Sequence, residues 1–420
     1  MRKFAGYAVI VSISVLLFDL MALLLPRGLT LEFDGYRRPE STNDLIIGSR
    51  ASYPRNYFVA HSERGFDIGK RRTARHYLQE WGFYDVWSNE LGCFDDPYRS
   101  DETSDGYVYL AGDSYTWGFA PFEHHFGSLL EKRLGVKTVK CGVTNTGQRH
   151  QFSKFLDVTE LIGKLPSVVV VNYVANDIAD DYSYPTSTVM DGWMVNRVEL
   201  SANDEVVPIP REETLARMAR MGLARIDPSP QAEPPLDRVK RFLKRYSASL
   251  HIVLAAKNWM IAELFAAPAS PDVGSGSGAR EKARRGYWAL YDLKDGLPFA
   301  DVSYSGPNRQ ALIEWQEHAQ AHGYELIVSL VASSFDPTGS RMFDDVRTFL
   351  EGIGVTVFDS ARHFTERHPV DAQSLYWKVD GHFNIEGQSV YADFLAASLR
   401  DACVLESHTA MACGPAHHDP

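Results

Sequence analysis

The sequence predicts an α/β fold of three layers (α/β/α), in which a five-stranded parallel sheet lies between two layers of helices. Two observations support this fold class. From residue 107 onward, short apolar runs alternate with longer segments of helical periodicity, a pattern typical of a parallel sheet covered by helices. The chain also has enough material for a large core, since 45% of its 420 residues are apolar and 12% are aromatic.

Five strand and helix units follow one another along the chain. The expected strands cover residues 107–111, 137–141, 167–173, 325–329 and 355–358. The expected helices cover residues 123–134, 148–162, 308–322, 341–353 and 385–401. Residues 105–184 and 303–403 therefore form the two parts of one domain.

The segments outside these units show weaker patterns. Residues 28–104 have no sustained periodicity, and we expect an extended lead-in that packs on the main domain. Residues 185–302 are an insertion, in which two breaker-rich stretches flank a helical segment that is basic over residues 238–245. This segment is either a surface helix or a helix that binds a membrane or an acidic polymer. The tail at 404–420 is expected to be disordered.

The N-terminus predicts a membrane helix. Arg2 and Lys3 precede an apolar stretch over residues 4–25, which matches the ~20 residues that a helix needs to cross a bilayer. A cleaved signal peptide is the alternative, but Pro26 stands where small residues of a cleavage site are expected, which favours an uncleaved anchor over residues 1–27. We therefore expect a single-pass protein of the cytoplasmic membrane. Because the basic flank stays in the cytoplasm, the domain that follows the anchor is expected to be periplasmic or extracellular.

Charge and cysteine content limit the partners. A formal net charge of −11 argues against general binding to nucleic acids or anionic lipid surfaces. No CxxC pair occurs, so neither a zinc site nor a disulfide framework is expected, and no metal or other cofactor is implied. Of the four cysteines, only Cys403 and Cys413 are close enough in sequence to suggest a bridge. Four free thiols, with Cys93 and Cys141 among them, are the alternative.

A candidate nucleophile follows the first strand, in the run Gly112-Asp113-Ser114. A serine hydroxyl becomes a useful nucleophile only when a base can take its proton, and the carboxyl end of a parallel strand is a place that other chain segments can reach. A turn in which Ser114 caps a helix is the alternative. The motif is not the nucleophile elbow of α/β-hydrolases, because Thr116 occupies the position of its second glycine.

Two further segments could stabilise the negative oxygen that forms when serine attacks an ester. Asn176 follows the third strand, and an asparagine amide there can donate a hydrogen bond to that oxygen, although an asparagine that only caps the next helix is the alternative. The turn at 142–147 contains Asn145 and Gly147, and such residues can adopt the left-handed conformation that directs a backbone N–H toward a ligand.

A candidate general base lies near the end of the chain. His382 follows Asp380 and Gly381, and histidine is the usual base at neutral pH when a carboxylate on its other ring nitrogen fixes the tautomer. If the segment is extended, Asp380 and His382 project to the same side. A loop with a solvent-exposed histidine is the alternative.

Together these motifs resemble the four sequence blocks of the SGNH (GDSL-like) hydrolase superfamily. The blocks correspond to Gly112-Asp113-Ser114, the turn at 142–147, Asn176-Asp177 and Asp380-Gly381-His382. The chain is similar to membrane-anchored members that add or remove O-acetyl groups on bacterial polysaccharides. It departs from the family pattern at three places: Asn145 and Val174 replace glycines, and one residue instead of two separates Asp380 from His382.

The resemblance implies a flavodoxin-like sheet and a set of roles. Ser114 would be the nucleophile, His382 the base and Asp380 the group that orients the imidazole. The oxyanion hole would be formed by Asn176 and by the backbone N–H groups of Ser114 and of Asn145 or Gly147.

Three hypotheses about function follow. The first is a serine esterase or acyltransferase that acts on O-acetyl groups of an extracytoplasmic polysaccharide, with lipid or short-chain acyl esters as alternative substrates. The second is a catalytically silent carbohydrate-binding module of a membrane complex, which would be favoured if Ser114 and His382 lay beyond hydrogen-bond reach. The third is a structural partner of a membrane complex, suggested by Asp19 within the apolar stretch and by the insertion.

Overall fold

A computed structural model describes most of the chain between Pro54 and Ala402. Its described residues are 56–78, 80–200, 206–220, 299–334, 342–367, 372–377 and 381–402, with Ser14, Val15, Leu17 and Pro54 as isolated positions. Among these residues, no helix combines the length and the apolar character needed to span a bilayer. Apart from Ser14, Val15 and Leu17, the expected anchor falls outside the described residues. The basic segment of the insertion, the C-terminal tail and Asp380 do so as well, and all these expectations stay predictions.

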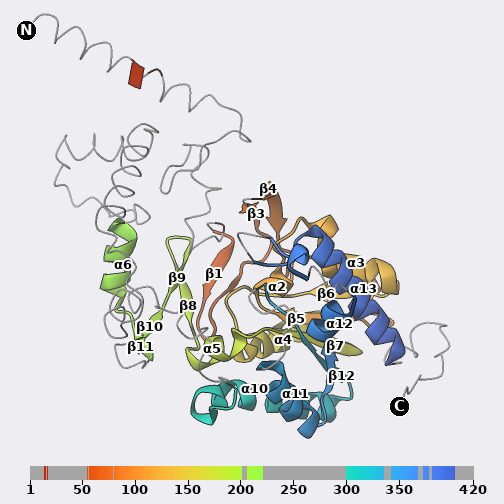
Figure 1. Ribbon diagram of the computed structural model, residues 1–420. Helices are drawn as coiled ribbons and strands as arrows, with labels where there is room; N and C mark the ends of the chain where they lie inside the picture. The colour runs from red at the N-terminus through yellow and green to blue at the C-terminus, as the bar shows by residue number, and fades with distance from the viewer. Residues whose placement is uncertain are drawn as a thin grey trace, which may run out of the picture.

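The core is a five-stranded parallel sheet with the strand order β13-β12-β7-β5-β6. Its strands are β5 (Val108–Gly112), β6 (Thr138–Lys140), β7 (Val168–Tyr173), β12 (Glu325–Leu330) and β13 (Thr356–Asp359). All five strands predicted from the sequence are present. The order reverses between β5 and β7, which lie side by side at the centre of the sheet (Figure 1), and this point is where ligands bind in open α/β sheets.

Helices cover both faces of the sheet, which confirms the three predicted layers. One face carries α4 (Gln148–Ile162), α10 (Val302–His322) and α11 (Met342–Gly352), whose apolar side chains pack with Val169 and Val171 of β7. The other face carries α3 (Phe126–Leu134), α12 (Ser360–Arg367) and α13 (Ile385–Asp401), which pack with Val168 and Val170. Because both faces of β7 are buried, its sequence is a continuous apolar run rather than an alternating one.

The lead-in contains more structure than the sequence predicts. It forms two antiparallel hairpins, β1 (Phe58–His61) with β2 (Gly65–Ile68) and β3 (Thr73–Leu78) with β4 (Gly82–Trp87). Their buried side chains join Trp117 and Phe119 of the main domain in a third apolar cluster. The lead-in therefore packs on the main domain as two hairpins.

The described parts of the insertion are also structured. They comprise the hairpin of β8 (Ser187–Met190) and β9 (Trp193–Asn196), the pair of β10 (Val198–Leu200) and β11 (Val206–Pro208), and α6 (Arg211–Arg220). The next helix, α10, begins six residues before the predicted start, with the Asp301 side chain accepting a hydrogen bond from the Ser303 backbone N–H. The remaining short helices are η2 (Ser100–Thr103), α2 (Ser114–Trp117), η3 (Phe122–His124), α5 (Asp177–Tyr182) and η5 (Ala372–Leu375).

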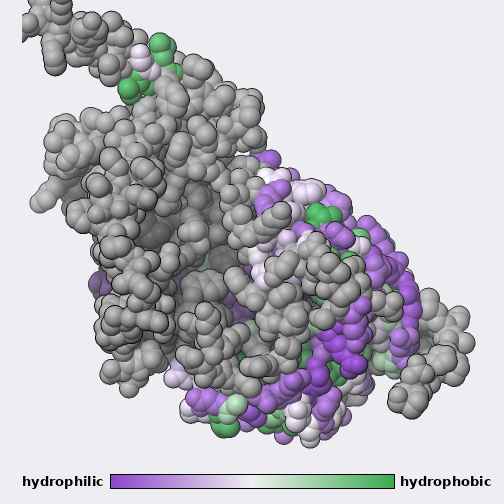
Figure 2. Space-filling view, in the orientation of Figure 1, coloured by the Kyte–Doolittle hydropathy of each residue, from purple (hydrophilic) through white to green (hydrophobic). Residues whose placement is uncertain are grey.

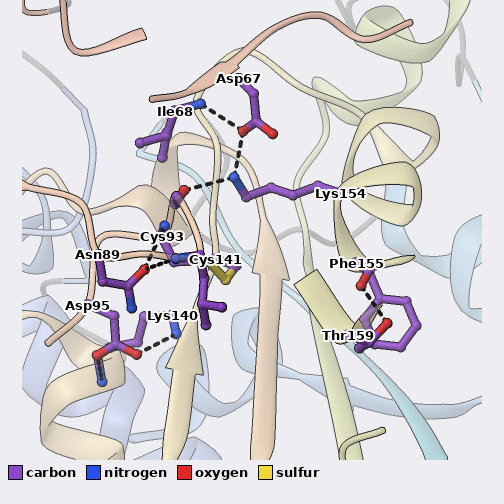
Figure 3. Close-up of a disulfide and its surroundings, with 12 residues drawn as sticks. Asp67, Ile68, Asn89, Cys93, Asp95, Lys140, Cys141, Lys154, Phe155 and Thr159 are labelled. Carbon is purple, nitrogen blue, oxygen red and sulfur yellow. Dashed lines mark hydrogen bonds and ion pairs between the residues drawn. A yellow bond between two sulfur atoms is a disulfide. The ribbon is translucent and has the colours of Figure 1, made fainter. Parts of the chain in front are cut away.

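A disulfide joins Cys93 to Cys141, which corrects the expectation that these two cysteines are free thiols. The bridge links the lead-in to the residue that follows β6 and spans 48 positions of sequence. Figure 3 shows two buried ion pairs beside it, from Lys140 Nζ to Asp95 Oδ1 at 2.7 Å and from Lys154 Nζ to Asp67 Oδ1 at 2.5 Å. Folding of the sheet brings β6 against the lead-in, and this proximity is not visible in the spacing of the cysteines. The pair Cys403 and Cys413 lies outside the described residues.

Candidate active site

The turn that carries Ser114 begins where β5 ends. Gly112 has a φ of 149°, and a Cβ atom there would overlap the Thr116 side chain, so the tight turn requires glycine. Asp113 then caps the short helix α2, since its Oδ1 accepts a hydrogen bond of 2.9 Å from the Tyr115 backbone N–H. Ser114 thus stands at the carboxyl edge of β5, next to β7, as the sequence predicts.

His382 reaches Ser114 from the far end of the chain. Its Nε2 lies 2.8 Å from Ser114 Oγ, although the two residues are 268 positions apart. The imidazole stacks flat on the Phe119 ring, with 3.8 Å between ring centroids and an angle of 2° between ring planes. The backbone beside it is fixed as well, because the Trp377 N–H donates to the His382 carbonyl and the Tyr115 hydroxyl donates to the Gly381 carbonyl. This geometry suits proton transfer from serine to histidine.

Asn176 is connected to Ser114 by hydrogen bonds to the Asp113 side chain. It follows β7 at the start of α5, and its Nδ2 donates to Asp113 Oδ2 at 2.9 Å and to Asp180 Oδ2 at 3.1 Å. Asp113 Oδ2 also accepts a hydrogen bond of 3.0 Å from Ser114 Oγ. The proposed oxyanion donor and the nucleophile therefore share one acceptor in this state, and the Asn176 amide must turn from a carboxylate to meet a substrate oxygen.

Asp113 and Asp180 are site residues that the sequence analysis does not identify. Both side chains are fully buried. Burial raises the pKa of the Asp113 carboxyl, although the hydrogen bond from Asn176 opposes the shift. Burial and the nearby charges of Asp113 and Asp181 raise the pKa of Asp180 well above its usual range. The only sequence signals were the position of Asp113 before the serine and the i, i+4 spacing of Asn176 and Asp180 on a helix.

The loop after β6 packs against the nucleophile turn. The Val143 backbone N–H donates to the Gly112 carbonyl at 2.9 Å, which fixes the loop beside α2. Asn145 has a φ of 61°, the left-handed conformation expected for this turn. Its side-chain Nδ2 donates to Ser187 Oγ at 2.8 Å, so the backbone N–H is the group that remains for an oxyanion.

Gly147 has a packing role that the sequence does not indicate. A Cβ atom at this position would overlap the carboxylate of Asp181. That carboxylate caps α4, because it accepts hydrogen bonds from the backbone N–H groups of Gln148 at 3.0 Å and Arg149 at 2.9 Å. Gly147 thus allows Asp181 to approach the helix, and its part in an oxyanion hole stays a prediction.

The structure brings three of the candidate residues together, and a fourth, Asp380, is not among the described residues. Ser114, His382 and Asn176 converge from three distant chain segments at one edge of the sheet. Asp380 lies outside the described residues, so the group that orients His382 stays a prediction. Within the described part of the chain, no group of three or more His, Cys, Asp or Glu side chains is arranged to hold a metal ion.

Comparison with known proteins adds little to this geometry. No protein-family model matches the sequence, and no curated protein sequence matches it. Among solved structures, LAE5, an α/β hydrolase enzyme from the metagenome of Lake Arreo in Spain, is 12% identical over 71% of this chain and 96% of its own, with a TM-score of 0.34. A protein described as lipolytic and of the G-D-S-L family, from Desulfitobacterium hafniense DCB-2, is 12% identical over 70% of this chain and 98% of its own, with a TM-score of 0.32. Similarities this low do not assign an activity.

Proposed function

We propose that the protein is a serine esterase or acyltransferase in which Ser114 is the nucleophile and His382 the general base. The observation that carries the proposal is the 2.8 Å distance between His382 Nε2 and Ser114 Oγ. A serine nucleophile needs a general base within hydrogen-bond reach, and this distance meets that requirement. A separation of the two side chains would have favoured the silent binding module, so their contact favours the enzyme.

The proposed reaction starts with a change of hydrogen-bond partner. The Ser114 hydroxyl turns from Asp113 Oδ2 to His382 Nε2, which takes its proton while Oγ bonds to the ester carbonyl carbon. The Asn176 amide and the backbone N–H groups of Ser114 and of Asn145 or Gly147 donate hydrogen bonds to the negative oxygen. The bond to the leaving alcohol then breaks, and that oxygen takes the proton from Nε2. Water or a sugar hydroxyl repeats the sequence on the acyl-serine and releases the acyl group.

The proposed substrates are O-acetyl groups of a polysaccharide outside the cytoplasm. The four sequence blocks support an ester substrate by resemblance, and the apolar stretch at 4–25 supports a membrane anchor with the catalytic domain outside. The Cys93–Cys141 disulfide supports the same location, because disulfides persist mainly in oxidising compartments. Asp380 remains the proposed orienting carboxylate for His382.

The test is an esterase assay on the full-length protein in detergent, with 4-nitrophenyl acetate and acetylated glycans as substrates. Ser114→Ala and His382→Ala should each remove nearly all turnover, at least about 10³-fold, and the double variant should lose little more because the two residues act as one unit. An organophosphonate should label Ser114 in the wild type and not in Ser114→Ala. Wild-type turnover in Ser114→Ala, with contaminating esterases excluded, would overturn the proposal.

A further inference from the structure

Trp81 is exposed at the tip of the β3–β4 hairpin. Its side chain keeps 45% of its surface accessible, and it is the one exposed tryptophan among the described residues. The turn is closed by a hydrogen bond of 3.1 Å from the Trp81 backbone N–H to the Leu78 carbonyl. An exposed indole at a hairpin tip presents a flat apolar surface that a ligand can cover.

The hairpin holds Trp81 in a fixed place beside the active site. Leu78, Tyr84 and Val86 are buried in the same apolar cluster as Trp117 and Phe119. The Tyr84 hydroxyl also donates to the Gly118 carbonyl, directly after the nucleophile helix, at 3.3 Å. Trp81 therefore lies on a hairpin that packs against the turn containing Ser114.

Contacts between aromatic residues connect Trp81 to His382, the proposed base. The Trp81 and Trp377 rings lie 6.3 Å apart, and Trp377 Nε1 donates to the Phe119 carbonyl at 3.0 Å. Phe119 in turn stacks on His382. The His124 ring also contacts Trp81, with ring centroids 5.7 Å apart. Both neighbours meet the indole at steep angles of 63° and 68° rather than stacking flat on it.

We propose that Trp81, with Trp377 and His124 beside it, is a subsite that binds a sugar ring of the substrate next to the acylated residue. This inference rests on the proposed esterase function and names its substrate class. A sugar ring presents C–H bonds on its faces and hydroxyls around its rim, so it packs on a flat indole while its rim stays hydrated. The His124 imidazole can form a hydrogen bond with one of those hydroxyls.

A lipid surface or a protein partner fits the observations less well. Either needs a contiguous apolar patch, whereas the other strongly exposed apolar side chains of the main domain, Leu156, Leu161 and Val302, lie on α4 and α10. On the face that Figure 2 shows, the coloured hydrophobic residues form small separate patches among hydrophilic ones. The net charge of −11 also opposes anionic lipid.

The test compares kcat/KM for acetylated cellopentaose, acetylated methyl glucoside and 4-nitrophenyl acetate. Wild-type full-length protein should prefer the pentaose. Trp81→Ala should raise KM for the pentaose about tenfold with little change in kcat, and so reduce the preference over the nitrophenyl ester by a similar factor. Trp81→Tyr, which keeps a flat ring, should retain most of the preference. Leu156→Ala, a matched loss of an exposed apolar side chain on α4, should leave all three substrates unaffected.

Other outcomes separate this inference from the esterase proposal. Equal loss on all three substrates, or none on any, would refute the sugar subsite while the esterase stands. Calorimetry with acetylated cellopentaose and the Ser114→Ala protein checks binding without turnover, and about tenfold weaker binding when Trp81→Ala is added would support the subsite even if the wild type proved inactive. Trp81-dependent binding to phosphatidylcholine vesicles with no effect on the glycan would assign Trp81 to a lipid and overturn the inference.

Discussion

One carboxylate oxygen, Oδ2 of Asp113, accepts hydrogen bonds from both Ser114 and Asn176. The two groups that we propose act on the same carbonyl are thus held at a fixed spacing before a substrate arrives. Because the shared acceptor is buried, the two donors keep their orientation without competition from water. The second Asn176 hydrogen bond, to Asp180, restricts the amide further.

Asp180 is expected to act as a positioning residue for Asn176. Asn176→Ala should slow the chemical step on the order of 10²–10³-fold with substrate binding largely intact, since its amide meets charge present only in the transition state. Asp180→Ala removes one hydrogen bond that orients this amide, so kcat should fall on the order of tenfold at unchanged KM. Asp180→Asn keeps an oxygen acceptor and should restore most of the activity. A rise in KM with unchanged kcat would contradict this role.

The residues of the site differ in how far the sequence predicts them. Ser114 and His382 stand in motifs whose chemistry requires a partner, so their meeting could be anticipated. Asp113 and Asp180 act through contacts with Asn176 that depend on side-chain orientation, which spacing does not specify. Trp81 carries no motif, and its place beside the active site follows only from the packing of the hairpin on Trp117 and Phe119.

At the scale of elements, a strand can be predicted from the sequence when its burial produces a clear pattern of apolar residues. The strand β7 is recognisable because four consecutive valines are buried between two helical layers. The hairpins of the lead-in are not recognisable, because strands such as β1 and β2 have only four residues and their side chains pack on the edge of a core formed by distant segments. The Cys93–Cys141 pairing is not recognisable either, because it depends on the packing of the lead-in against the main domain.

The Cys93–Cys141 bridge is expected to stabilise both the fold and the loop that follows β6. The bridge closes a loop of 48 positions and so lowers the entropy of the unfolded chain. In the chain-entropy model this raises the free energy of unfolding by about 4 kcal/mol. Reduction should therefore lower the melting temperature of the wild type. It should also lower esterase activity, because Cys141 anchors the loop that carries Asn145. The double variant Cys93→Ala, Cys141→Ala is the control and should melt at the lower temperature with or without reductant. An unchanged melting temperature after verified reduction would contradict this expectation.

At the scale of the whole molecule, buried histidines link stability to pH. His125 is fully buried beneath the nucleophile helix, and burial lowers its pKa from 6.5 to about 3. Its Nδ1 accepts from the Gly127 N–H and its Nε2 faces the Thr116 carbonyl, both at 3.0 Å, so only the neutral Nε2–H tautomer satisfies both bonds. Burial also lowers the pKa of His150 to about 3. Both histidines are therefore neutral in the folded state at neutral pH.

His125 is expected to contribute stability that is lost in acid. Between pH 6.5 and 3 the unfolded state binds a proton that the folded state does not, so the contribution is complete above pH 6.5 and falls by up to ~1.4 kcal/mol per pH unit as the pH drops. His125→Asn keeps a capping oxygen for Gly127 but cannot titrate. The free energy of urea unfolding of the wild type minus that of the variant should therefore be larger at pH 7 than at pH 4.5. A difference independent of pH would contradict the assignment.

The edge of the sheet at β6 has a consequence for the chain before it is fully folded. Two backbone N–H groups of β6 are not directed at β5; Thr138 donates to Glu131 Oε2 at 3.2 Å and Lys140 to Asp95 Oδ2 at 3.4 Å. An open strand edge is a template on which another molecule can add a strand, and here carboxylates occupy those positions instead. Since Asp95 belongs to the lead-in that Cys93 fastens to Cys141, closing the disulfide also seals this edge against aggregation.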